Sequence, residues 1–246
     1  MNPAVVVELA LLFAIGAALY SSVGHGGASA YIAAMALFSI APETMKPTAL
    51  ALNLLVAGFG TWRYWSRDLT NWKLVLAFAL TATPAAFIGG GVHLPAIYYK
   101  PLVGLLLWAS AARLLWQPRT LAERQVRPPS WWTTLPAGAV LGVLAGLTGT
   151  GGGIFLSPLI ILNAWEEPRR TSGVVAAFIF LNSAAGLAGN AASVGHLPKE
   201  LPFFLGAVLA GAVLGTWLGV ERLPRAWLLR TLGAVLVVAG AKLLFT

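Results

Sequence analysis

The sequence has no cysteine and few charged residues. The absence of cysteine from all 246 residues excludes disulfide bonds, thiolate metal sites and cysteine nucleophiles. Asp, Glu, Lys and Arg make up 10% of the chain and hydrophobic residues 58%, whereas an ordinary soluble domain carries roughly 25% charged residues. This composition predicts an all-α integral membrane protein, because helices satisfy their own backbone hydrogen bonds in lipid.

Acidic side chains are nearly absent from the apolar blocks, where Glu8 is the only one clearly inside. Paired carboxylates, acidic metal clusters and a carboxylate relay for protons are therefore not expected. The one candidate for an enzymatic dyad is His25 with Ser21, Ser22 or Ser29, which all lie close to it in sequence. We expect no enzyme, no catalytic residue, no metal and no cofactor.

The chain reads as ten apolar segments, five in each half, separated by polar or proline-containing junctions. The expected segments are 4–20, 28–41, 47–65, 71–91, 97–116, 134–148, 153–164, 170–192, 200–220 and 226–245. The stretch between the halves contains Pro118, Pro128 and Pro129, which are typical of a linker. We therefore divide the chain into an N-terminal repeat (1–116), a cytoplasmic linker (117–133) and a C-terminal repeat (134–246).

The two halves align with one another. Matched pairs are Gly24 with Gly149, Gly26 with Gly151, Gly27 with Gly152, Asn53 with Asn182, and Leu94-Pro95 with Leu223-Pro224. With five elements in each half, the halves would cross the membrane in opposite directions. An inverted-topology repeat of this kind is typical of secondary transporters.

The basic residues are expected at the junctions, where they report on membrane orientation rather than on nucleic acid binding. If alternate junctions share a side, twelve basic residues lie on one side and Lys46, Lys100, Lys199 and Lys242 on the other. The crowded side carries Arg63, Arg67, Lys73, Arg113, Arg119, Arg124, Arg127, Arg169, Arg170, Arg222, Arg225 and Arg230. The positive-inside rule makes that side cytoplasmic. We expect a multi-pass protein of a bacterial cytoplasmic membrane, in contact with lipid, with both termini outside and no nucleic acid partner.

Segments 134–148 and 153–164 look too short to span a membrane alone, which needs about 20 residues. They are better explained as a re-entrant hairpin that turns at the glycine run "GTGGG" of Gly149–Gly153. The run "GHGG" of Gly24–Gly27 would form the tip of a second hairpin inserted from the opposite side. We expect the two tips to meet near the middle of the membrane.

Each helix that restarts after a glycine turn points backbone N–H groups and its positive dipole end at the tip, which suits an anion. Hydroxyl and amide side chains nearby would add donors. The residues expected to bind substrate are Gly24, His25, Gly26, Gly27, Ser29, Asn53, Thr148, Gly149, Thr150, Gly151, Gly152, Gly153 and Asn182.

Each of these residues also has a plain structural interpretation. The glycines could simply allow tight helix packing, and this is the favoured explanation for Gly211, Gly215 and Gly219. His25 could donate to an anion, carry a proton or form a neutral hydrogen bond to a carbonyl. Asn53 and Asn182 could line the site or satisfy backbone groups that the helix breaks leave free.

The runs "GLTGTGGGIFLSPLIIL" and "RRTSGVVAAFIFLNSAAG" resemble the second-half signature of the sulfite exporter TauE/SafE family of membrane permeases. The resemblance covers essentially the whole chain and implies transport of sulfur oxyanions or organosulfonates, such as sulfite or sulfoacetate. The first half departs from the pattern, with His25 in its turn and Ala33 where the second half has Pro158. A passive anion channel or permease subunit is the alternative, and coupling to H⁺ or Na⁺ and assembly into a homo-oligomer stay open.

Overall fold

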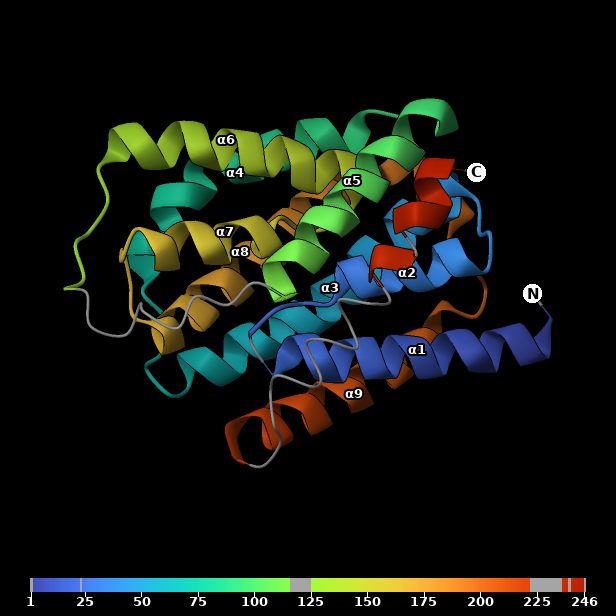
Figure 1. The fold of residues 1–246 in the computed structure, drawn as a ribbon, viewed down its shortest axis with the longest axis horizontal. Helices are drawn as coiled ribbons and strands as arrows, with labels where there is room; N and C mark the ends of the chain where they lie inside the picture. Colours follow the sequence, from blue (N-terminus) through green and yellow to red (C-terminus); the bar gives the residue numbers. More distant parts are fainter. Residues whose placement is uncertain (1, 23, 116–124, 222–235, 239, 246) are drawn as a thin grey trace.

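In the computed structural model, residues 2–22, 24–115, 125–221, 236–238 and 240–245 are described, and every regular element within these ranges is helical (Figure 1). The elements are α1 (Pro3–Ser21), α2 (Ala28–Leu37), α3 (Pro42–Trp65), α4 (Trp72–Gly91), α5 (Ala96–Leu115), α6 (Trp131–Thr148), α7 (Gly153–Leu162), α8 (Pro168–Gly189), a 3₁₀ helix η1 (Ala191–His196) and α9 (Leu201–Glu221). Of the segments expected from the sequence, 226–245 lies partly outside the described residues. The prediction of an all-α membrane protein is confirmed, since α1, α4, α6 and α8 are long and apolar enough to cross a membrane.

Helix α6 is longer than the sequence suggested. It begins at Trp131, because the Ser130 hydroxyl accepts a hydrogen bond from the Trp132 N–H at 3.4 Å and caps the helix. Its 18 residues extend about 27 Å at 1.5 Å per residue. The expectation that this segment is too short to span a membrane was therefore wrong, whereas α7, with 10 residues, is short.

Helix α3 begins at Pro42 instead of residue 47, so Lys46 lies inside a helix and not in a junction. Pro42 occupies the first helical turn, where its missing N–H costs no hydrogen bond. The Lys46 side chain is 6% exposed. The interpretation of Lys46 as a junction charge was wrong, because neighbouring backbone carbonyls accept hydrogen bonds from its ammonium group.

The buried side chains form two clusters, and each draws helices from both halves of the sequence. One cluster joins α1, α2, α3 and α5 to α9, and the other joins α4 to α6, α7 and α8. Figure 1 shows α1 beside α9 and α4 beside α6, while α3 and α8 pack against each other between the clusters. The two halves are therefore interlocked.

Small residues let the paired helices approach to backbone contact. A Cβ atom on Gly211 or Gly215 of α9 would overlap the carbonyl oxygen of Ala14 or Ala18 in α1. The packing interpretation of these two glycines is confirmed, and Gly219 lies among residues whose packing is not described.

Substitution of Gly215 by leucine is expected to separate α1 from α9 and to lower stability by roughly 1–3 kcal/mol, as overpacking does. Gly206 on the same helix provides a matched control, because a Cβ atom there would meet nothing within 4 Å. Thermal unfolding of the purified protein measures both variants. Equal unfolding temperatures for Gly215→Leu and Gly206→Leu would contradict the packing.

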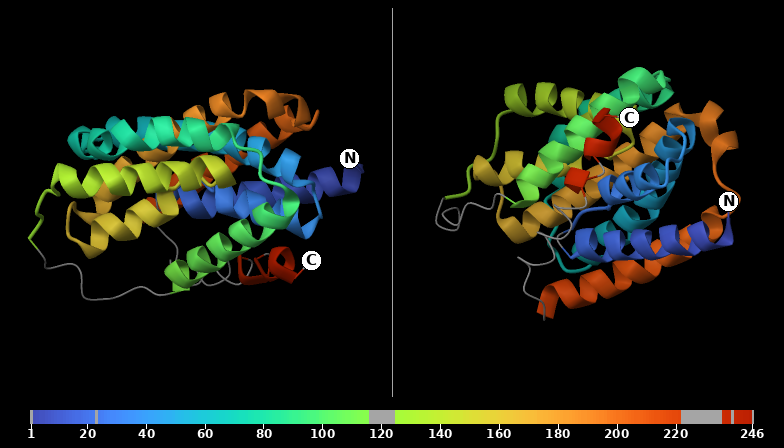
Figure 2. Two further views of the ribbon diagram at one scale, coloured as in Figure 1. Left: turned by 90° about the horizontal axis from the view of Figure 1, so that it is seen from above. Right: turned by 45° about the vertical axis from the view of Figure 1, so that its right-hand side comes forward.

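The described ends of the chain lie at the same end of the molecule in Figures 1 and 2. Because the chain has no cysteine, single cysteines can report which membrane face this is. A membrane-impermeant maleimide is expected to label Lys199→Cys in intact cells, and Arg67→Cys only after permeabilisation. The reverse pattern would place the termini in the cytoplasm.

Candidate substrate site at the paired glycine turns

The first glycine turn connects α1 to α2. Gly24 and Gly27 have φ angles of +77° and +104°, a region that favours glycine over residues with a Cβ atom. The hydrogen bonds that hold the turn include those from the His25 N–H to the Tyr20 carbonyl at 2.9 Å and from the Tyr31 hydroxyl to the Gly26 carbonyl at 2.8 Å. The backbone path of this turn therefore requires glycine at positions 24 and 27.

The second turn connects α6 to α7, and Gly149, Gly151 and Gly152 have φ angles of +80°, +73° and +76°. A Cβ atom on Gly152 would contact the Leu141 carbonyl oxygen and the Ala145 side chain, so α7 folds back along α6. In Figure 1, α6 and α7 extend from their turn toward one end of the molecule, and α1 and α2 extend from theirs toward the other.

The helices that follow the turns start without side-chain caps. Asn2 and Asn71 accept hydrogen bonds from the first-turn N–H groups of α1 and α4. The helices α2 and α7 begin after Gly27 and Gly152, which have no side chain to cap them. The helices α3 and α8 also begin without a side-chain cap. The first N–H groups of a helix have no partner within the helix. Both short helices therefore present uncapped donors at their turns.

The amide of Asn53 lies between the two turns. A Cβ atom on Gly26 would overlap Asn53 Oδ1, and one on Gly151 would approach Asn53 Nδ2. The same Nδ2 donates to Ser183 Oγ at 3.0 Å, which links α3 to α8. One buried side chain thus contacts both glycine turns and both central helices.

Asn182 is fully buried, and neither amide atom has a hydrogen-bond partner in the described structure. It follows Phe178 and Ile179 by one helical turn on α8, so it shares their face. Cβ atoms on Gly152 and Gly153 would contact those two side chains. An unsatisfied buried amide costs roughly 1–3 kcal/mol, a cost that a polar ligand beside the second turn would remove.

The other residues that we expected to bind substrate also lie in or beside the turns, but their nearest neighbours are residues other than Asn53. Gly24 packs against Ser172, Gly27 against the Tyr31 ring, and Gly149 against Lys46. His25 is half-buried with its ring 6.3 Å from that of Tyr20, and Ser29 is buried in the first turn of α2.

The hydroxyls of Thr148 and Thr150 bond to one another at 2.9 Å. Thr148 Oγ1 also donates to the Leu144 carbonyl at 2.6 Å, which leaves Thr150 as the donor within the threonine pair. Both hydroxyl protons are therefore used inside the second turn in this arrangement.

Sequence reasoning missed Ser183, the hydrogen-bond partner of Asn53, and a cavity around Lys46. The cavity has a volume of about 250 Å³ and adjoins the second turn. Ser183 stands next to Asn182 in the sequence, and "APETMKP" contains a lysine between two prolines. Neither pattern by itself distinguishes a buried polar contact from a loop.

The comparisons with known proteins identify the family of the chain. The family model described as "Sulfite exporter TauE/SafE" matches residues 9–243. The chain belongs to the TauE/SafE family. "Probable membrane transporter protein y4hK" of Sinorhizobium fredii (strain NBRC 101917 / NGR234) is 41% identical over 97% of this chain and 98% of its own length.

A second relative is "Probable membrane transporter protein YjnA" of Bacillus subtilis (strain 168), which is 27% identical over 97% of this chain and 99% of its own length. No solved structure matches the chain significantly. As a TauE/SafE family member the chain is a membrane transporter and not an enzyme, as the sequence predicted.

Substitution of Gly151 by valine is expected to abolish transport, because a side chain would meet Asn53 and is strained at positive φ. Gly195→Val is the control, since a Cβ atom there would meet nothing within 4 Å. Uptake of labelled substrate, with membrane insertion checked by western blot, compares the two. Normal uptake by Gly151→Val would remove the second turn from the site.

Proposed function

We propose that this TauE/SafE transporter is a secondary transporter of small anions, with sulfur oxyanions and organosulfonates such as sulfite and sulfoacetate as its substrates. It would move them across the cytoplasmic membrane by alternating access. The observation that carries the proposal is the contact of one buried amide, Asn53, with both glycine turns, after which α2 and α7 begin without side-chain caps. The description of the matching family as a sulfite exporter supports the substrate class.

The turns suit an oxyanion for two physical reasons. Helix N-termini carry partial positive charge and present N–H donors, so they favour negative groups. Glycines add no side chain, which lets a pyramidal or tetrahedral oxyanion approach the backbone closely. In this proposal the Asn182 amide and the remaining N–H of Asn53 complete the binding site.

The arrangement of the helices in two clusters suggests how alternating access would occur. The α1–α2 hairpin packs with α9, and the α6–α7 hairpin packs with α4. Rocking of one cluster against the other, along the packed α3 and α8, would open the turns first to one side and then to the other. His25 is the titratable side chain in the turns, so it or the substrate would carry the proton if transport is coupled to H⁺.

Counterflow separates this transporter from a passive anion channel. Proteoliposomes loaded with unlabelled sulfite or sulfoacetate are expected to accumulate the labelled anion transiently, with a saturable rate, because a carrier exchanges substrate across the membrane. A rate that grows linearly with concentration, without acceleration by internal substrate, would identify a channel.

Replacing Asn53 by aspartate is expected to reduce anion transport at least tenfold. The variant preserves the shape of the amide but puts a negative charge beside both turns, and two like charges about 4 Å apart repel by about 4 kcal/mol at an effective dielectric constant of about 20. Asn163→Asp is the control, since Asn163 is an exposed amide at the end of α7. Unchanged anion uptake by Asn53→Asp would place the anion elsewhere.

A further inference from the structure

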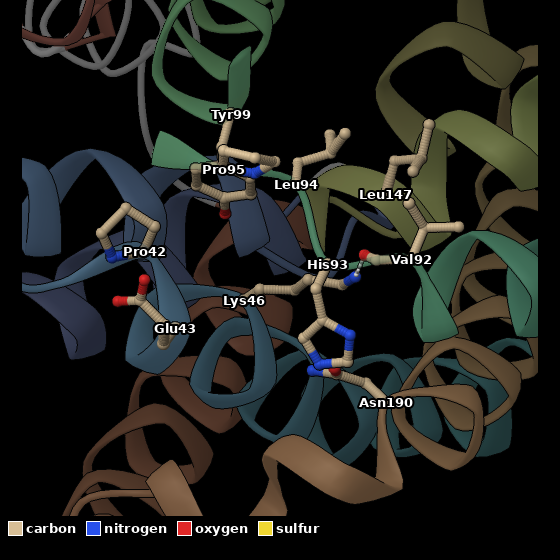
Figure 3. A pocket seen from close by; sticks show the side chains of 10 residues that line it. All are labelled: Pro42, Glu43, Lys46, Val92, His93, Leu94, Pro95, Tyr99, Leu147 and Asn190. Atoms are coloured by element: carbon tan, nitrogen blue, oxygen red, sulfur yellow. Dashed lines mark hydrogen bonds between the residues drawn. The ribbon is translucent and has the colours of Figure 1, made fainter. Parts of the chain in front are cut away.

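A cavity of about 250 Å³ lies where α3 begins and α4 ends, next to the second glycine turn (Figure 3). Its lining residues come from the starts of α3 and α5, the 92–95 connection, the end of α6 and the residue after α8. They are Pro42, Glu43, Lys46, Val92, His93, Leu94, Pro95, Tyr99, Leu147 and Asn190. The substrate site proposed above does not include this cavity.

Lys46 supplies a buried positive charge to the cavity. Its ammonium group donates to the carbonyl oxygens of Gly89, Gly90 and Val92 at 3.2, 2.8 and 3.0 Å. These acceptors lie at the C-terminal end of α4, whose dipole favours a cation. The three carbonyls use all three N–H donors of the ammonium group, so Lys46 contributes its charge rather than a hydrogen bond. The Glu43 carboxylate supplies one opposite charge to the same lining.

Asn190 contributes an amide that has no partner. The residue is 1% exposed, and neither Nδ2 nor Oδ1 has a hydrogen-bond partner in the described structure. Figure 3 shows the Asn190 amide and the His93 ring on the same side of the cavity as the Lys46 ammonium. A buried amide without a partner is rare enough in native proteins to require an explanation.

The opposite wall is different in character. Pro42, Leu94, Pro95 and the neighbouring aliphatic side chains make much of the lining apolar, and the exposed Glu43 carboxylate lies beside Pro42 in the view of Figure 3. An engineered apolar cavity of roughly 150 Å³ accommodates benzene. A cavity of about 250 Å³ therefore has room for a hydrocarbon group as well as an oxyanion.

The cavity is connected to the proposed transport site by direct contacts. The Tyr99 hydroxyl donates to the Thr148 carbonyl at 3.1 Å, and the Lys46 backbone lies against Gly149. Leu147, which lines the cavity, immediately precedes this turn. A molecule held in the cavity would thus lie beside the second glycine turn.

We propose that this cavity is a second binding site, one for a small organic anion with a sulfonate or carboxylate head and a short hydrocarbon chain. The head group lies at the Lys46, His93 and Asn190 side, and the chain lies against the prolines and leucines. This second site rests on the proposed transport function and specifies its substrate class further. Its apolar wall would make organic anions better ligands than bare sulfite or sulfate.

A homologous ligand series tests the site on the purified full-length protein by isothermal titration calorimetry. Methanesulfonate, ethanesulfonate and propanesulfonate are expected to bind with affinities that rise about fourfold per added CH₂, as burial of a methylene predicts. Acetate, propionate and butyrate form a parallel series that distinguishes sulfonate from carboxylate heads. Affinities that do not rise with chain length, or no binding of either series, would overturn the proposal.

Two variants locate the binding. Asn190→Leu removes an amide that has no partner, so it is expected to preserve folding while lowering propanesulfonate affinity at least fivefold. His93→Ala is expected to act similarly, and His196→Ala is its control, since this exposed histidine of η1 lies outside the cavity lining. Wild-type affinity in both cavity variants, each verified by gel filtration, would overturn the site.

Measurements of transport and of propanesulfonate binding by Gly151→Val distinguish the cavity site from the transport site. The variant, verified as folded by gel filtration, is expected to lose transport but to keep propanesulfonate binding within twofold, because Gly151 does not line the cavity. If the folded variant loses propanesulfonate binding as well as transport, the ligand belongs to the glycine turn and the second site is overturned. Anion binding by a wild-type protein that transports no anion would instead reject the proposed function and keep the cavity site.

Discussion

The structure depends on one buried amide held between two backbone turns. Asn53 touches Gly26 on one side and Gly151 on the other, and its Nδ2 donates to Ser183 on α8. Any side chain at either glycine would displace it. The glycines that break the apolar segments are therefore needed for two reasons, the left-handed backbone of the turns and the space that the amide occupies.

The same contact joins the two halves of the chain, because Asn53 of the first half meets Gly151 and Ser183 of the second. The packing of α1 with α9 and of α4 with α6 joins the halves at two further places. Backbone contacts at Gly211 and Gly215 allow this close approach. A TauE/SafE transporter built in this way has two clusters of helices that share α3 and α8 as their common boundary.

The sequence predicted the parts of the structure that depend on local pattern. Apolar segments and clustered glycines predicted the helices and both turns, since positive φ is a property of single residues. It did not predict the partnership of Asn53 with Ser183, which are 130 positions apart. The sequence also placed Lys46 wrongly, because the charges and prolines in "APETMKP" are typical of a junction. In the fold, carbonyl groups that are distant in sequence accept hydrogen bonds from its ammonium group and keep it buried. Substrate binding by the turn residues is a prediction from the sequence.

The most direct measurement of the central idea is an electron cryo-microscopy structure of the protein with a transported anion bound. We predict density for the anion within hydrogen-bond distance of the first N–H groups of both α2 and α7, and next to the Asn53 amide. Density that contacts only one of the two turns, or neither, would contradict a single site formed by the paired glycine turns.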